Sequence, residues 1–435
     1  MSRHSAHGDS RLSFWLHVRE FAVPASVIET TTARRLAGDW AGACAAAGVE
    51  VDLDLRTTAR RYGRELTARI RGDLQGLAPD LLRWHLPRIA PDGLLRPGLT
   101  VPLARYGDVH LVVRTPPGWA SGGQRFALAL HDGTADRADA HPHPHPHPHP
   151  SRRFRLDLHR HLWDARRSGE LPLRLGGPER WAAEARILLR ADGHPDGADA
   201  VRVRLGARRQ VVVAAGTGGH TARDALPMLP RLPLLPDPAV RVPPDLELLR
   251  AGLIGPERLH PLVAEALVPG HSAADGGPGS GSGAAPGAAP GGQRLVECRG
   301  DRHRIGLVDG VLTALDHTPA EIRREELLMA LTGTPLPCLQ AVDDAHRRPE
   351  SLADVRARLL HGDAAGALSV VEDLLGPDAL LRAGALRDEL AAAAERRIAY
   401  GLFRAGLAGR SPLRAHPAGP RPQGRRSRPR HANHR

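Results

Sequence analysis

A low-complexity run near the middle of the chain limits what the rest can fold into. Residues 271–292 consist of Gly, Ser, Ala and Pro apart from His271 and Asp275. Such a segment has too little apolar surface to pack, and its Gly and Pro residues break both helices and strands, so it is typical of a flexible linker. We therefore expect at least two folded parts, each with a core of its own.

The hydrophobic period changes within the part that precedes this linker. Helical spacing dominates up to about residue 98, and from Leu99 the segments VPLA, DVHLVVR and QRFALALH alternate with a period of two. Helices followed by consecutive strands indicate the α+β class rather than a wound parallel sheet. The expected fold is thus an N-terminal mixture of helices and strands, a flexible Gly/Ser/Pro linker, and a C-terminal β-hairpin with a helical domain.

Changes in composition and the Gly- and Pro-rich stretches along the chain predict six segments. They are an N-terminal α+β domain (11–140), a His-Pro linker (141–150), a second α+β region packed with the first (151–268), a flexible linker (269–293), a hairpin plus helical domain (294–409) and a disordered basic tail (410–435).

Four local predictions concern the first half of the chain. Residues 1–10 are expected to be disordered, and the alternation of Phe14, Leu16 and Val18 favours a strand over residues 12–23. Residues 57–74 carry apolar side chains at helical spacing and predict one amphipathic helix. Alternation also favours a strand over residues 154–164.

Residues 298–338 contain the clearest local signals of the chain. Asp309-Gly310 between apolar residues predicts a hairpin turn. Thr318, Pro319 and Glu321 form the pattern of a capping box with proline at the first helical position, and Gly333 predicts the end of that helix. The second half of the helix is apolar all round, so we expect it to be buried.

The same stretch holds four residues of zinc-ligating types, namely Cys298, His303, His317 and Cys338. Their spacing is not that of a zinc finger, because no pair lies two to four residues apart. The alternative is that the cysteines are small buried apolar residues and the histidines line the hairpin rim. Cys338 with His317 also has the composition of a nucleophile and base, without a third group to orient the base.

A second set of candidate ligands follows the His-Pro run. On a strand, Asp157, His159 and His161 share one face, and there they could bind a metal or act as acid and base. The alternative is a polar, solvated strand face. The five His-Pro repeats at 141–150 favour polyproline II geometry, whose rotating side chains do not converge on one ion.

Composition excludes several classes of enzyme. All 60 basic residues are arginine, so the chain has no lysine for a P-loop, a Schiff base or a kinase site. Three cysteines do not make a disulfide framework. No apolar run is long enough for a signal peptide or a membrane span, so we expect a cytoplasmic protein without membrane contact.

The positive charge is concentrated at the C-terminus. The formal net charge is +12, and residues 410–435 hold eight arginines and no acid. Such a tail could bind nucleic acid through phosphate contacts, but it has no aromatic residue on which a base could stack.

Three stretches resemble a family of proteins from GC-rich actinobacteria that has no established activity. They are TARRLAGDWAGACAAAG (32–48), LAPDLLRWHLPRIAPDGLLRPG (77–98), and CRGDRHRIGLVDG with the helix REELLMALTG that follows it. The resemblance implies a component of multi-gene systems that contain AAA-type ATPases and von Willebrand A-type proteins. It implies no catalytic residues.

Together these features predict a non-catalytic adaptor or scaffold that acts through protein partners, possible partners including an AAA-type ATPase. The alternatives are a nucleic-acid-binding protein that uses its tail and a metal-dependent enzyme that uses one of the two ligand sets. We expect no cofactor in the first case and zinc in the last.

Overall fold

The computed structural model describes residues 3–132, 149–194, 200–206, 209–215, 220–221, 232–268, 270, 294–298, 301–308, 311–333, 337, 340–342, 351–375, 380–381 and 383–407. They form an α+β structure, which confirms the predicted class. The chain divides into two compact units, Met1–Pro278 with Phe403–Arg435, and Gly279–Leu402. Most of the predicted His-Pro linker, nearly all of the predicted linker 269–293 and the whole tail 410–435 lie outside the described residues.

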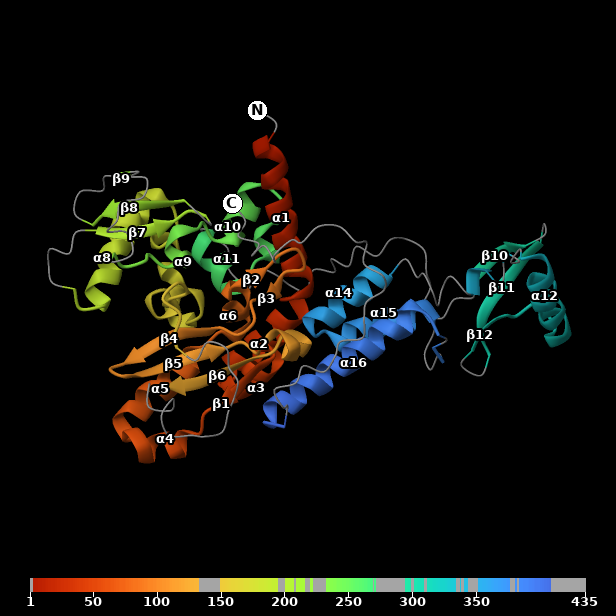
Figure 1. Ribbon diagram of the computed structural model, residues 1–435, viewed down its shortest axis with the longest axis horizontal. Coiled ribbons are helices and arrows are strands. Elements are labelled where there is room, and N and C mark those ends of the chain that lie inside the picture. The colour runs from red at the N-terminus through yellow and green to blue at the C-terminus, as the bar shows by residue number, and fades with distance from the viewer. Residues whose placement is uncertain are drawn as a thin grey trace, which may run out of the picture. The chain divides into compact units, whose positions relative to one another are not determined.

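The main sheet of the first unit has four strands in the order β1-β6-β5-β4 (Figure 1). Its strands are β1 (Val49–Asp52), β4 (Thr100–Tyr106), β5 (Val109–Arg114) and β6 (Phe126–His131). The three strands predicted after Leu99 are β4, β5 and β6, and they pair antiparallel. β1 joins the sheet edge parallel to β6, a pairing between segments far apart in sequence.

Helices supply most of the remaining structure of the first unit. They are α1 (Arg3–Phe21), α2 (Ala25–Leu36), α3 (Trp40–Ala46), α4 (Leu55–Tyr62), α5 (Arg64–Gly76), α6 (Pro79–His85), α8 (Trp181–Ala191), α9 (Asp237–Val240), α10 (Pro244–Arg250) and α11 (Pro261–Leu267). Aspartates begin two of them, because the Asp39 carboxylate accepts from the amide of Gly42 and the Asp54 carboxylate accepts from that of Thr57. α1 runs beside α10 (Figure 1).

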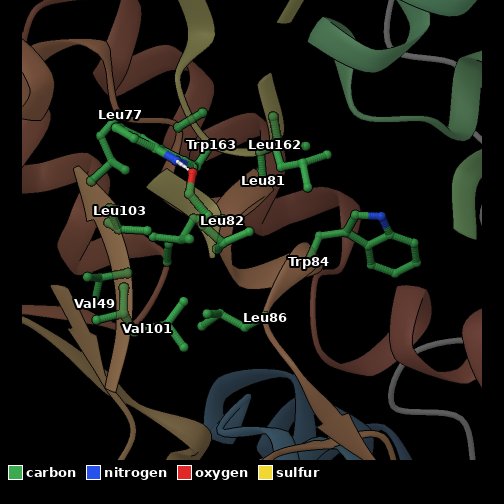
Figure 2. Packing of buried hydrophobic residues seen from close by; sticks show 14 of the residues in the cluster. Val49, Leu77, Leu81, Leu82, Trp84, Leu86, Val101, Leu103, Leu162 and Trp163 are labelled. Carbon is green, nitrogen blue, oxygen red and sulfur yellow. Dashed lines mark hydrogen bonds between the residues drawn. The ribbon is translucent and has the colours of Figure 1, made fainter. Parts of the chain in front are cut away.

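The short helix α6 lies at the centre of this unit. Six of its seven residues are buried, and Leu81, Leu82 and Trp84 pack into the main hydrophobic cluster (Figure 2). Arg83 on the same helix is only 5% exposed. Its guanidinium donates to the carbonyls of Ala22 at 2.8 Å and Gln124 at 2.7 Å, and more weakly to that of Ala47 at 3.4 Å. One side chain thus joins the ends of α1 and α3 to the loop before β6.

Smaller elements complete the first unit. They are β2 (Arg88–Ile89), β3 (Leu94–Leu95), β7 (Ala200–Arg204), β8 (Gln210–Ala214) and β9 (His220–Thr221). α8 packs on the sheet of β7, β8 and β9 through a second cluster that includes Trp181, Leu188 and Val213.

The predicted strand over residues 12–23 is wrong, because residues 12–21 belong to α1, which also contains most of the stretch expected to be disordered. Trp15, Val18, Arg19 and Ala22 recur at helical spacing, and the last three are at most 5% exposed. Alternation over three residues was therefore a weaker signal than the helical stripe. The predicted single helix 57–74 is divided at Gly63, whose φ of +87° favours glycine and separates α4 from α5.

The predicted strand over residues 154–164 is also wrong. The segment forms two 3₁₀ turns, Leu156–Leu158 and Arg160–Leu162, whose amides bond to carbonyls three residues back, as from His159 to Leu156 at 3.1 Å. Trp163 then enters the core, where its carbonyl accepts from Ala78 at the start of α6 (Figure 2). The 3₁₀ turns place buried side chains on more than one side of this segment, whereas a strand with one solvated face would bury only the other face.

The second unit begins with a hairpin–helix module, residues 294–333. It comprises β10 (Arg294–Cys298), β11 (Asp301–Val308), β12 (Val311–Ala314) and α12 (Pro319–Thr332). The predicted hairpin is β11–β12, and β10 adds an antiparallel strand. The Thr318–Glu321 capping box is present in full, and Gly333 ends the helix with a φ of +68°.

The prediction that the second half of α12 is buried is wrong. Leu327, Leu328 and Leu331 are 61%, 43% and 85% exposed. A separate cluster holds the helices α14 (Leu352–His361), α15 (Ala364–Leu375) and α16 (Ala385–Arg404), with Val355, Val371 and Leu386 among its buried residues.

Substitution of Arg83 tests the role of α6. Arg83→Met keeps much of the buried stem but leaves the carbonyls of Ala22 and Gln124 without their donor, so we expect a loss of about 3 kcal/mol or more in the free energy of unfolding. Urea denaturation of the purified chain measures it. The matched control Arg71→Met, at an exposed position of α5, should change the value by less than about 0.5 kcal/mol. Equal effects of the two substitutions would contradict this role.

Candidate functional site

In the described structure, the side chains of the first predicted ligand set do not converge on one position as a group of three. Asp157 is held by a bidentate ion pair with Arg155, with both N–O distances at 2.8 Å. The rings of His159 and His161 lie 5.8 Å apart, and both residues are at most 3% exposed. The expected alignment of the three side chains on one strand face is lost, because the segment forms turns instead of a strand.

Each of the two histidines has a different surrounding. The Nδ1 atom of His159 lies 2.9 Å from the Arg155 carbonyl, and its Nε2 atom lies 3.4 Å from Glu184. Glu184 in turn accepts two hydrogen bonds from Arg174, at 2.6 and 2.8 Å. Burial lowers the pKa of His161 to about 2, so its ring is neutral at physiological pH. These contacts hold the two 3₁₀ turns of residues 156–162 against α8. The groups are buried, so a substrate does not reach them.

A second buried network, which sequence reasoning missed, connects α1, α6, α10 and α11. The Nε2 atom of His260 lies 2.9 Å from the Asp80 carboxylate, and the Trp84 indole donates to Asp245 at 2.7 Å. The Arg19 guanidinium lies over the Trp84 ring, 5.1 Å from its centroid. Burial raises the pKa of Asp245, although Arg19 and the indole oppose that effect. Its composition is that of an acid–base site.

Accessibility decides what this network can do. Its five members are at most 5% exposed, so a solute in bulk water does not reach them. The imidazole and carboxylate of the His260–Asp80 pair are 180 positions apart in sequence and carry no local motif. The only signal was that each stands beside a proline at the start of a helix. The pair joins α6 to α11 and is a structural contact.

The second predicted ligand set is partly brought together. His303 on β11 and His317, which precedes the N-cap of α12, have ring centroids 4.4 Å apart and planes inclined by 32°. The Nδ1 atom of His317 lies 3.6 Å from a Glu325 carboxylate oxygen. Among the described residues the Nδ1 atom of His303 and the Nε2 atom of His317 are buried without a hydrogen-bond partner. Such unsatisfied ring nitrogens can donate to or accept from a ligand.

A hollow of about 410 Å³ lies beside this histidine pair. Its lining comes from β12 and the first half of α12 and includes Thr313, His317, Ile322, Arg323 and Glu326. The residues offer a hydroxyl, an imidazole, a guanidinium and a carboxylate on an otherwise apolar wall. Of the predicted ligand set, His317 is the described residue that lines this hollow.

The cysteines of the second set are only partly described. Cys298 ends β10, where its backbone is opposite Asp301, and Cys338 lies outside the described residues. The proposed approach of His317 to Cys338 therefore stays a prediction. Cys44 is fully buried, and burial raises the pKa of its thiol to about 12, which leaves it protonated and unreactive. Across the described residues, no group of three or more His, Cys, Asp or Glu side chains converges on a metal position.

Comparisons with known proteins add no family to this description. No family model, curated protein or solved structure matches the chain. None of the helices in the described part of the chain combines the length and apolar character needed to cross a membrane.

Acidification tests the buried, neutral state of His161. Its folded pKa of about 2 is below the unfolded value of about 6.5, so between these values the unfolded chain binds the extra proton. The free energy of unfolding should therefore fall as the pH drops from 6.5 to 5, with a contribution from this residue that approaches about 1.4 kcal/mol per pH unit. Urea unfolding across that range measures the slope.

The variant His161→Gln should show a shallower slope by nearly one proton, because glutamine does not titrate. His194→Gln, at an exposed position, is the matched control and should keep the wild-type slope. Parallel curves for wild type and His161→Gln would show that this histidine is protonated in the folded chain.

Proposed function

We propose that this protein is a non-catalytic adaptor that binds a partner protein through the exposed face of α12. The observation that carries the proposal is the exposure of Leu327 and Leu331, at 61% and 85%. Large apolar side chains grouped on a surface favour binding of a partner that covers them. Full burial of each such side chain contributes roughly 1.5–3 kcal/mol of favourable free energy.

The helix geometry places these leucines together. Leu327 and Leu331 are four residues apart, so they are neighbours on one side of α12, and Leu328 lies beside them. Ile322, Glu325 and Met329 fall on the opposite side and are half-buried. α12 thus has a half-buried side and, opposite it, an exposed leucine stripe formed by Leu327, Leu328 and Leu331.

The charges around the stripe indicate the chemistry of the partner. Arg323 and Arg324 are exposed one helical turn before Leu327, and the helical position of Glu326 is away from the stripe. Glu321 lies two turns before Leu328 on the same face, and its carboxylate accepts hydrogen bonds from the amide and hydroxyl of Thr318. A complementary surface carries apolar side chains with carboxylates at one end. We infer that the partner presents an acidic amphipathic helix. The apolar face of that helix would pack along the leucine stripe of α12.

The partner class follows from the resemblance to actinobacterial multi-gene systems. In that setting we propose an AAA-type ATPase as the protein that carries the acidic helix, and a cytoplasmic location for the complex. The alternative of nucleic-acid binding depends on residues 410–435, which lie outside the described residues. The alternative of a metal-dependent enzyme has support only in the histidine pair of the hairpin–helix module.

The double variant Leu327→Asp with Leu331→Asp tests the proposal. Affinity purification from the native host with the wild-type chain identifies the partner, and isothermal titration with the two purified proteins measures the dissociation constant. We expect the double variant to weaken binding at least 100-fold, because two buried leucines are lost and two carboxylates face an acidic surface.

Two controls separate this face from other surfaces. Leu368→Asp changes an exposed leucine of α15, 48% exposed, and should leave the affinity within a factor of two. Arg324→Glu should weaken binding most at low salt, where charge steering is strongest. Unchanged affinity of the double variant would refute the proposal, and self-association lost in that variant would make a second copy of the chain the occupant instead.

A further inference from the structure

We propose that the hairpin–helix module binds an extended segment of a partner protein, which adds a fourth strand beside β12 and occupies the hollow between β12 and α12. The segment carries an acidic and a basic residue at alternate positions, one to pair with Arg323 and one to pair with Glu326. This site is distinct from the leucine stripe and does not depend on the adaptor role of that stripe.

The first reason is the open edge of β12. In the described structure it is the outer strand of the order β10-β11-β12. The Leu315 amide donates to the Arg304 carbonyl at 2.7 Å, so these two residues form a hydrogen-bonded pair. Bonded and non-bonded positions alternate along an antiparallel strand, so Thr313 bonds to β11, whereas Ala314 and Leu312 direct their N–H and C=O groups away from it. An extended backbone at this edge therefore meets the donors and acceptors of a strand.

The second reason is the hollow beside that edge. Its volume of about 410 Å³ is within the range of roughly 300–1,000 Å³ that is typical of ligand pockets. Residues 313–315 form one wall, and the other wall is one face of α12, made by Pro319, Ile322, Arg323 and Glu326. Side chains alternate between the two faces of a sheet, so every second residue of an added strand projects to the α12 side.

His317 brings a further polar group to the hollow. Its ring is part of the lining, its side chain is only 9% exposed, and its Nε2 atom has no hydrogen-bond partner among the described residues. The Ala314 carbonyl accepts a long bond of 3.4 Å from the His317 amide, so the Ala314 N–H is the better placed of its two groups for a partner strand. Both observations favour an occupant with polar backbone groups over a purely apolar one.

The charges on the helix wall specify the side chains of the segment. Arg323 and Glu326 are exposed, and in the described structure neither forms an ion pair. Residues three apart on a helix are separated by about 4.5 Å along its axis, and alternate residues of a strand by about 6.8 Å. Long side chains span this difference, so an acid and a base at positions i and i+2 of the segment match the two groups.

A peptide library tests the site. Random dodecapeptides displayed on phage are selected against the full chain and counter-selected against the double variant Arg323→Glu with Glu326→Arg. We expect the selected peptides to be rich in β-branched residues and to carry an acid and a base two positions apart. Fluorescence anisotropy with the labelled synthetic peptides then measures the dissociation constants.

Methylation of the peptide backbone tests whether it binds as a strand. N-methylation removes a donor, so at the residues whose N–H groups face β12 it should weaken binding at least tenfold. At the intervening residues it should leave the affinity within a factor of three. This measurement uses the unmodified protein and does not depend on how any variant folds.

An exchange of charges assigns the two side chains. The double variant Arg323→Glu with Glu326→Arg should bind a selected peptide at least tenfold more weakly. A peptide with its acid and base exchanged should bind that variant within a factor of three of the parent affinity. The control Leu327→Asp with Leu331→Asp should bind the original peptide as the parent does, and circular dichroism checks that each variant is folded.

Three results would overturn the proposal. They are a selection that yields no peptide with preference for the parent over the charge-exchanged variant, binders whose affinity is insensitive to N-methylation, and self-association of the chain that a selected peptide reverses. The last result would make the β12 edge of a second copy the occupant. Since only synthetic peptides are used, a failure here leaves the proposed role of the α12 leucines untouched.

Discussion

The buried arginine of α6 is the contact on which the N-terminal unit depends. Arg83 bonds to three carbonyls at the ends of separate segments, and burial lowers the pKa of its guanidinium to about 10 without making it neutral at physiological pH. A charge in that position is stable only while all its acceptors are in place. Two other residues of α6 make similar buried contacts, since Trp84 donates to Asp245 and Asp80 contacts His260, the N-cap of α11. The two turns of α6 therefore specify how α1, α3, α10 and α11 meet.

The two units treat their ionisable groups in opposite ways. In the first unit the acid–imidazole pairs His260–Asp80 and His159–Glu184 are enclosed, and they act as contacts between elements. In the hairpin–helix module His317 borders a hollow, and Leu327, Leu328 and Leu331 of α12 are exposed. Groups that are enclosed stabilise a fold, while groups that remain open are available to a ligand or partner. Because of this difference, we assign the proposed binding of a partner protein to the second unit.

Local chemistry predicted elements well wherever a cap or turn is formed by neighbouring residues. The capping box of Thr318 and Glu321, the end of α12 at Gly333 and the antiparallel pairing of β11 with β12 all follow from interactions between residues close in sequence. Period-two alternation over short stretches was less reliable. It predicted strands at residues 12–23 and 154–164, where helical packing of Val18 and core insertion of Trp163 decided the structure. The pairing of His303 with His317 was predicted only as membership of one set, since their distance depends on how α12 returns over the sheet.

The sequence by itself determined the α+β class, the capping box of Thr318 and Glu321, the absence of lysine-dependent chemistry and the residue types that can bind a metal, because these depend on composition and on near neighbours. Only the tertiary structure decided which polar groups are enclosed and which face solvent. Asp80 and His260 are 180 residues apart and form a buried contact, whereas the apolar half of α12 is exposed. Burial depends on which elements pack together, and the energy of that packing is a property of the whole unit rather than of any local pattern.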